Sequence, residues 1–240
     1  MILLTNDDGI FSEGIRALRE AIVTKEKAIV VAPDSEQSAV GHAITISNPL
    51  RVKETHFNGE FWGYSVSGTP ADCVKIAVGS ILEETPKMVI SGINHGGNLG
   101  TCVIYSGTVS AATEAAILGI PSIAISLNDF QNLDFSFAAS FIAKFYPQVL
   151  AMKLPKGIVL NVNVPAVPEK EIKGVVFAKQ GGLKVEDQFE KRNDPRGNHY
   201  YWMSGEVVLD LSEKGTDGAY ISQNYVTVTP VHYDLTHYET

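Results

Sequence analysis

Short apolar runs alternate along the chain with stretches in which apolar residues recur every three or four positions. The apolar runs are typical of strands buried on both faces of a sheet, and they occupy residues 1–4, 28–32, 88–90, 122–127 and 158–164. The helical stretches lie between them, at about residues 13–22, 70–81, 108–118 and 134–152. Pro147 is expected to kink or divide the last helix. The order predicts an α/β fold over residues 1–240, in which a mostly parallel sheet has helices on both faces in a three-layer, Rossmann-like arrangement.

Two parts of the chain depart from this alternation. Residues 50–67 hold two strand-like runs around Asn58-Gly59, a dipeptide favoured in two-residue hairpin turns, and they predict an antiparallel hairpin insertion. Residues 171–240 form a less regular region with strand-like runs separated by a charged loop. Within that region, residues 225–235 alternate well enough to form a terminal strand or hairpin arm.

Composition and charge narrow the classes of partner. The formal net charge of −8 argues against a nucleic-acid polymer, because its phosphates would be repelled. No segment approaches the roughly 18 apolar residues of a membrane helix, so no membrane is expected as a partner. Only two cysteines occur, Cys73 and Cys102, without CxxC spacing. That usage is typical of reduced thiols and predicts a cytoplasmic protein.

Two adjacent carboxylates follow the first predicted strand. Gly9 lets the chain leave strand geometry, so that Asp7 and Asp8 can face one point. Ser38 and Asn94 lie in polar loops after two later strands, and ligands of open α/β sheets bind beyond the carboxyl ends of strands. Such an all-oxygen set suits magnesium, manganese or calcium better than zinc or copper. A solvated turn and loop caps are the competing interpretations.

The stretch Ser106-Gly107-Thr108 supplies a second candidate. Free N–H groups at the start of the following helix, with the hydroxyls of Ser106 and Thr108, can hold a phosphate. A plain helix cap is the competing interpretation. A cation site beside an anion site is typical of phosphoryl transfer.

Six stretches together carry a family resemblance. They are Leu4-Thr5-Asn6-Asp7-Asp8-Gly9-Ile10; Ala32-Pro33-Asp34 with Ser38 and Ala43-Ile44-Thr45; Ser67-Gly68-Thr69-Pro70-Ala71-Asp72-Cys73-Val74; Ser91-Gly92-Ile93-Asn94 through Gly100; Tyr105-Ser106-Gly107-Thr108-Val109; and Asp194-Pro195-Arg196-Gly197. In this order they resemble the SurE family, the survival-protein-E nucleotidases. Each motif is weak alone, whereas six in register are specific.

The resemblance implies a divalent-metal-dependent phosphatase that acts on nucleoside 5'- and 3'-monophosphates, in some members also on polyphosphate. It implies one Mg²⁺ or Mn²⁺ per subunit, held by Asp7, Asp8, Ser38 and Asn94. It also implies a homodimer or tetramer in which an extended C-terminal arm, residues 225–240, is exchanged between subunits.

Roles within the predicted site follow from this chemistry. Catalysis is assigned to Asp7, Asp8 and Asn94, and contacts to the substrate phosphate are assigned to Asn6, Asn98, Ser106, Gly107 and Thr108. The group that protonates the leaving alcohol stays open between His42, His95 and water. A phosphatase with an aspartyl-phosphate intermediate, a receiver-like signalling module and a nucleotide sensor without turnover are the alternative functions. The preferred base also stays open.

Overall fold

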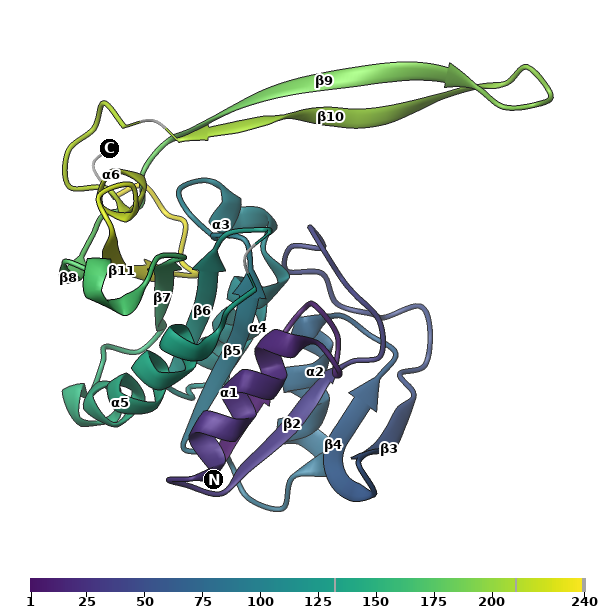
Figure 1. Ribbon diagram of the computed structural model, residues 1–240. Helices are drawn as coiled ribbons and strands as arrows, with labels where there is room; N and C mark the ends of the chain where they lie inside the picture. Colours follow the sequence, from purple (N-terminus) through teal and green to yellow (C-terminus); the bar gives the residue numbers. More distant parts are fainter. Residues whose placement is uncertain (132, 210, 239–240) are drawn as a thin grey trace.

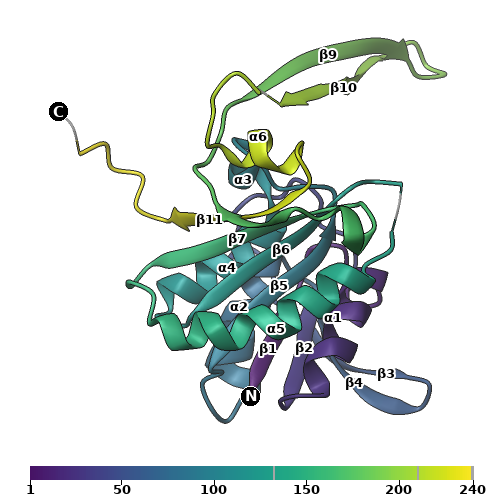
Figure 2. The same ribbon diagram turned by 60° about the vertical axis from the view of Figure 1, so that its left-hand side comes forward.

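A nine-stranded mixed sheet forms the centre of the molecule (Figures 1 and 2). The computed structural model describes residues 1–131, 133–209 and 211–238. The strand order is β3-β4-β2-β1-β5-β6-β7-β11-β8. The strands are β1 (Ile2–Thr5), β2 (Ala28–Pro33), β3 (Val52–Phe57), β4 (Glu60–Val66), β5 (Met88–His95), β6 (Ser122–Asn128), β7 (Ile158–Pro165), β8 (Gly174–Phe177) and β11 (Tyr225–His232). The run from β4 to β7 is parallel throughout.

Helices cover both faces of this sheet, which confirms the predicted α/β class. One face carries α1 (Glu13–Val23) and α5 (Ser136–Met152), and the other carries α2 (Pro70–Ile76) and α4 (Gly107–Ile117). Alternate residues of β1 serve the two cores: Ile2 and Leu4 pack toward α1 and α5, whereas Leu3 packs toward α2 and α4. Short helical segments are η1 (Ala77–Ile81), α3 (Cys102–Tyr105), η2 (Glu169–Glu171) and α6 (Asp217–Ile221). Pro147 lies inside one continuous α5, so it does not divide the helix.

The hairpin predicted at residues 50–67 is present as β3 and β4. Both turn residues, Asn58 and Gly59, have positive φ angles of 52° and 82°, as a type I′ turn requires. However, β4 also pairs in parallel with β2. The hairpin therefore extends the main sheet at its edge and does not stand apart as an insertion.

The C-terminal region differs from the prediction. We expected residues 225–240 to form an arm without a partner in its own subunit, and this is wrong for residues 225–232. They form β11, which is antiparallel to β7 and parallel to β8, because Val226 and Val228 are buried in the core. The residues after β11 lead away from the body (Figure 2), and the last two, 239–240, lie outside the described residues.

A long hairpin is the element that projects from the body. Its strands are β9 (Leu183–Asn193) and β10 (His199–Leu209), which pair with each other in a separate two-stranded sheet. Both views show it extending well beyond the nine-stranded sheet (Figures 1 and 2). Among the helices of the described residues, none is long and apolar enough to cross a membrane.

Candidate active site

The polar loops at the carboxyl ends of β1, β2 and β5 meet around one cavity of about 250 Å³. Six predicted site residues line it: Asp7, Asp8, Ser38, Asn94, Asn98 and Ser106. The rest of its lining consists of Ala39, His95, Gly96, Gly97, Cys102, Tyr105 and Phe130. Residues more than 90 positions apart in the chain are thus brought to one edge of the sheet, as expected for a parallel α/β fold.

Asp7 is held from two sides. The Thr108 hydroxyl donates a short hydrogen bond to Asp7 Oδ1, and the Gln37 N–H donates to the Asp7 carbonyl at 2.8 Å. A Cβ at Gly107 would lie 2.7 Å from Asp7 Cβ, so only glycine lets the first turn of α4 approach this closely. These contacts bring the Ser38 loop and the start of α4 to the same carboxylate.

Asp8 is paired with His95, one of the groups that the sequence left open as proton donor. His95 Nδ1 lies 2.9 Å from Asp8 Oδ1. The pairing of β5 with β6 shifts register between Ser91 and Asn94, which changes the direction of the side chains that follow. The Asn94 amide nitrogen donates to the Gly96 carbonyl at 2.7 Å, so its oxygen is the atom offered to a ligand.

The two carboxylates lie in an environment that disfavours their charge. Burial raises the pKa of Asp7. Burial, together with the neighbouring Asp7 and Glu36 carboxylates, raises the pKa of Asp8 to about 8. Among the ion pairs of the described residues, neither carboxylate has a Lys or Arg partner. A site with this deficit of positive charge favours a bound cation.

The donor set fits a hard divalent cation. The described residues contain no group of three or more His, Cys, Asp or Glu that could hold a metal. A cation between Asp7 and Asp8 would therefore need neutral oxygens, and Asn94 and Ser38 line the same cavity. The Ser38 hydroxyl donates to Glu36 at 2.5 Å, which leaves its lone pairs available. Carboxylate, amide and hydroxyl oxygens are the ligands that Mg²⁺ and Mn²⁺ prefer.

Asn98 is fixed by two buried asparagines that sequence reasoning missed as site residues. Asn163 Oδ1 accepts the Asn98 N–H at 2.8 Å, and its Nδ2 donates to the Asn98 carbonyl at 3.1 Å. Asn161 Nδ2 donates to the same carbonyl at 2.7 Å. The available signal was the pair of polar residues in the otherwise apolar strand β7. They satisfy the backbone N–H and carbonyl of Asn98, which lies in the glycine-rich loop, residues 96–100.

Three predicted site residues lie outside the set of described residues that line the cavity. Asn6 donates to the Gly9 carbonyl at 3.0 Å and to the Ser12 hydroxyl at 2.8 Å, so it braces the turn beneath the carboxylates. Gly107 and Thr108 contact Asp7 instead of facing the cavity. Ser106 does line the cavity, and its hydroxyl also caps α4 by accepting the Val109 N–H at 3.0 Å.

The two candidate histidines are separated by the fold. His42 Nε2 lies 2.8 Å from Glu114 Oε2, and Lys75 binds the other oxygen of the same carboxylate at 2.9 Å. His42 is not among the residues that line the cavity, whereas His95 is. The structure therefore leaves His95 as the histidine within reach of a substrate there.

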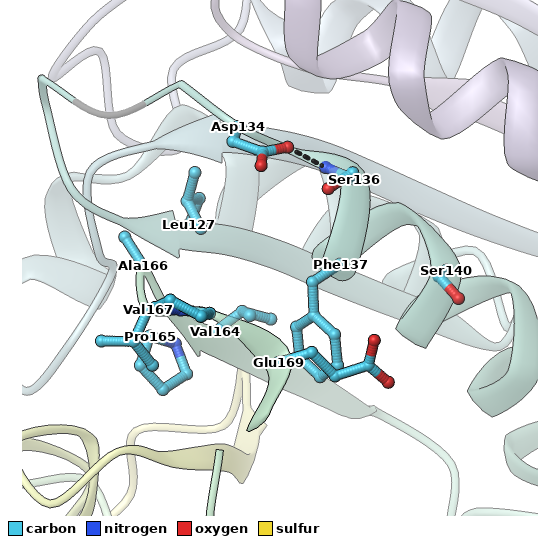
Figure 3. Close-up of a pocket in the computed structure, with 11 residues that line it drawn as sticks. Leu127, Asp134, Ser136, Phe137, Ser140, Val164, Pro165, Ala166, Val167 and Glu169 are labelled. Carbon is cyan, nitrogen blue, oxygen red and sulfur yellow. Dashed lines mark hydrogen bonds between the residues drawn. The ribbon is translucent and has the colours of Figure 1, made fainter. Parts of the chain in front are cut away.

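A second, larger cavity carries none of the predicted residues. Figure 3 shows this space of about 410 Å³ at the start of α5 and the end of β7. Its lining includes Phe137, Val164 and Glu169, and its Asp134 accepts the Ser136 N–H at 3.0 Å. Asp7 and Asp8 do not line this cavity, so we place the chemistry in the smaller one.

Comparison with known proteins identifies the family. Residues 2–187 match the family model described as Survival protein SurE. The chain belongs to the SurE family. It is 51% identical over 238 residues to the 5'-nucleotidase SurE of Syntrophobacter fumaroxidans, covering 99% of this chain and 95% of that one. It is 53% identical over 248 residues to the 5'-nucleotidase SurE of Natranaerobius thermophilus, covering 99% and 94%.

A solved structure of the SurE family has the same fold. The crystal structure of the SurE protein from Aquifex aeolicus matches with a TM-score of 0.86 at 43% sequence identity, covering 99% of this chain and 95% of that chain. The family resemblance and the α/β, Rossmann-like fold predicted from the sequence are thus confirmed.

Proposed function

We propose that the protein is a divalent-metal-dependent 5'-nucleotidase that hydrolyses nucleoside monophosphates to nucleoside and phosphate. The observation that carries this proposal is the buried pair Asp7 and Asp8, which faces a cavity without a Lys or Arg partner among the described residues. The names of the relatives, 5'-nucleotidase SurE, support the same reaction class. We extend the proposal to 3'-monophosphates and polyphosphate, because all share a terminal phosphoryl group.

Asp7, Asp8, Ser38 and Asn94 would hold one Mg²⁺ or Mn²⁺ in each subunit. When bound, such a cation polarises the phosphoryl oxygens and lowers the pKa of a water molecule. Thr108 keeps the Asp7 carboxylate turned toward the cavity, and His95 does the same for Asp8. Because both carboxylates are oriented before a ligand arrives, little rearrangement is needed on binding.

Two residues that line the same cavity, Ser106 and Asn98, suit the phosphate. Ser106 lies at the N-cap of α4, where N–H groups and the helix dipole favour an anion. Asn98 lies nearby on a backbone that the β7 asparagines hold in place. We assign Asn98 and Ser106 to orientation of the phosphoryl group, and Gly107 and Thr108 to positioning of Asp7.

His95 is the proposed proton donor to the leaving alcohol. Its Nδ1 faces Asp8, which leaves Nε2 as the nitrogen that can hold a proton toward the substrate. Asp8 stabilises the protonated ring through the same contact. In this scheme Asn94 acts by positioning and not by proton transfer.

The decisive experiment measures inorganic phosphate released from AMP and GMP, from their 3' isomers and from short polyphosphate. Each is assayed with Mg²⁺, Mn²⁺, Ca²⁺ and EDTA. Metal-dependent release from a 5'-monophosphate supports the proposal. Binding of nucleotide without release under every metal would indicate a sensor and overturn it. Acid quenching that traps a phosphorylated protein would indicate an aspartyl-phosphate intermediate instead.

We also propose that the protein is cytoplasmic and that it assembles as a homodimer or tetramer, in which the residues after β11 form the exchanged C-terminal arm. Cys73 and Cys102 are free thiols, as a reducing compartment allows. The hairpin of β9 and β10 exposes Phe189, Trp202 and Met203 by 59 to 70%. Large exposed apolar side chains on a projecting element favour contact with a second copy. Light scattering of the full chain tests this, and a monomer at every concentration would contradict it.

A further inference from the structure

Asp217 is a fully buried carboxylate on which three separate segments meet. It is the first residue of the short helix α6, and its solvent-exposed fraction is 0%. Its Oδ1 accepts the N–H of Gly181 at 2.9 Å and that of Gly218 at 2.8 Å. Its Oδ2 accepts the N–H of Gly100 at 2.9 Å. Both oxygens are thus engaged by backbone donors from α6, the base of the β9–β10 hairpin and the glycine-rich loop after β5.

Gly100 is held on its other side as well. The side chain of Gln180 donates from Nε2 to the Gly100 carbonyl at 2.9 Å. Gly100 lies between Asn98 and Cys102 in the chain, and both of these line the catalytic cavity. Asp217 and Gln180 therefore hold the N–H and the carbonyl of one residue in the middle of the segment that forms one wall of the site.

The close approach depends on a glycine at the hairpin base. A Cβ at Gly181 would lie 2.9 Å from Asp217 Oδ1 and 3.0 Å from the Thr216 Cβ. The neighbouring Lys179 forms a bridge with Thr216, and the N–H of Asp217 donates to the Lys179 carbonyl at 2.8 Å. The segment before β9 is thus seated against α6 by contacts that converge on Asp217.

The chemistry of this contact calls for a carboxylate. Two oxygens are needed as acceptors, because Oδ1 and Oδ2 each receive backbone N–H groups. Hydrogen bonds to an ionised acceptor are shorter and stronger than those between neutral groups. An asparagine keeps one acceptor only, so it retains the two bonds at Oδ1 and loses the bond to Gly100.

We propose that Asp217 is a positioning residue that fixes the glycine-rich loop, residues 96–100, and through it the phosphate side of the active site. The match to the family model ends at residue 187, before this residue. The inference deepens the proposed nucleotidase function and rests on it. Asp217 acts through the loop and touches neither the substrate nor a cation.

The test compares Asp217→Asn with the wild-type enzyme in steady-state hydrolysis of a nucleoside 5'-monophosphate with Mn²⁺. We expect kcat/KM to fall by about 10- to 100-fold, since small misplacements of a binding wall cost activity on this scale. Inhibition by inorganic phosphate should weaken in parallel, because phosphate uses the same wall. The assays are run well below the Tm of each variant, so that the folded fraction is complete.

Two further variants make the result decisive. Gln180→Glu removes the donor to the Gly100 carbonyl from the other side, and it should lower kcat/KM and phosphate affinity in the same direction. Asp134→Asn removes an exposed carboxylate that accepts a backbone N–H at the start of α5, and it serves as the control for the loss of one charge. Its kcat/KM should stay within about two-fold of the wild-type value.

The outcomes separate this inference from the proposed function. Wild-type kcat/KM and wild-type phosphate inhibition in a folded Asp217→Asn variant would overturn the inference. If Asp217→Asn does not fold, Gln180→Glu decides the question by the same criteria. A wild-type protein that releases no phosphate refutes the proposed function itself, before any variant is compared.

Discussion

Two aspartates with largely buried carboxylates, Asp8 and Asp72, have pKa values shifted in opposite directions. Asp8, after β1, has its pKa raised to about 8 by burial and by the neighbouring carboxylates of Asp7 and Glu36. Asp72, in the first turn of α2, is 3% exposed. Burial raises its pKa too, but hydrogen bonds from Thr45 and Thr69 outweigh this effect, and the pKa of Asp72 is lowered overall.

Asp8 and Asp72 differ in the number of hydrogen-bond donors that surround each carboxylate. Asp72 accepts the Thr45 N–H at 3.0 Å and the Thr69 N–H at 3.0 Å, and it completes a capping box. Asp217 likewise accepts three backbone N–H groups. Among the described residues, Asp8 is contacted by His95, through a ring nitrogen and through a backbone hydrogen bond. A saturated carboxylate holds the backbone in place, whereas an unsaturated one is available for a ligand.

The largest expected effect comes from removing the carboxylate of Asp8. Asp8→Asn should lower metal-dependent turnover by about 10³-fold or more, since metal charge stabilisation is worth several kcal/mol. The metal-free variant should fold at least as stably as the wild type, because a buried repulsion has been removed. Phosphate release and thermal unfolding in EDTA measure the two effects. Turnover at the wild-type rate would refute the assignment of Asp8.

The second prediction concerns the pH dependence of the metal-free protein. The folded pKa of Asp8, about 8, lies above the ordinary aspartate value of 3.8, so the folded state retains a proton that the unfolded state releases. Its contribution to stability is therefore fully present below pH 4 and is lost as the pH rises toward about 8, by up to a few kcal/mol. Denaturant unfolding in EDTA across this range should show the slope.

Matched measurements sharpen this second prediction. Asp8→Asn should reduce the slope, because one of the two carboxyls with a raised pKa is absent. Added Mn²⁺ should restore stability at high pH by binding the folded state. An identical slope in the wild type and in Asp8→Asn would show that Asp8 does not titrate as described.

The third prediction concerns His95, which is the one ion-pair partner of Asp8 among the described residues. His95→Ala should weaken the apparent affinity for Mn²⁺ by about 10- to 100-fold, as is typical when a group that orients a metal ligand is lost. Activity titrated against Mn²⁺ gives the apparent constant. His56→Ala, an exposed histidine on β3, is the control. Equal Mn²⁺ affinity in both variants would contradict an orienting role for His95.

The smallest expected effect comes from substituting Asp72, whose carboxylate already accepts several hydrogen bonds. Asp72→Asn should lower the free energy of unfolding at neutral pH by about 1 to 2 kcal/mol, the usual cost of a lost helix cap. The lowered pKa of Asp72 means that its stabilisation is present above pH 3.8 and is lost as the pH falls through the folded value. Wild-type and variant stabilities should therefore converge in acid, opposite in sign to the slope from Asp8. A constant difference down to low pH would argue against this account.

Local patterns predicted most of the sheet and helices. The apolar run at residues 1–4 became β1, and the helix expected from about residue 70 begins at Pro70 as α2. Asn58-Gly59 turned the hairpin as expected. These predictions hold because turn, cap and burial preferences depend on a few neighbouring residues in the sequence.

Long-range pairing was harder to predict. The strand at residues 225–232 alternates like an edge arm, and only its partners β7 and β8 show that it belongs to the core. The projecting element proved to be the charged segment of β9 and β10. Strand propensity does not specify which strand a segment pairs with, since that choice depends on the packing of distant residues.

The sequence by itself determined the acidic pair, the order of the loops and the family to which they belong. The tertiary structure decided which of those polar residues face the cavity. It placed Asn6 beneath the turn, His42 on Glu114 and His95 on Asp8. It also revealed Asn163 and Asp217 as supports of the glycine-rich loop. The physical reason is that the state of a buried carboxylate depends on how many donors surround it, and those donors come from segments far away in the chain.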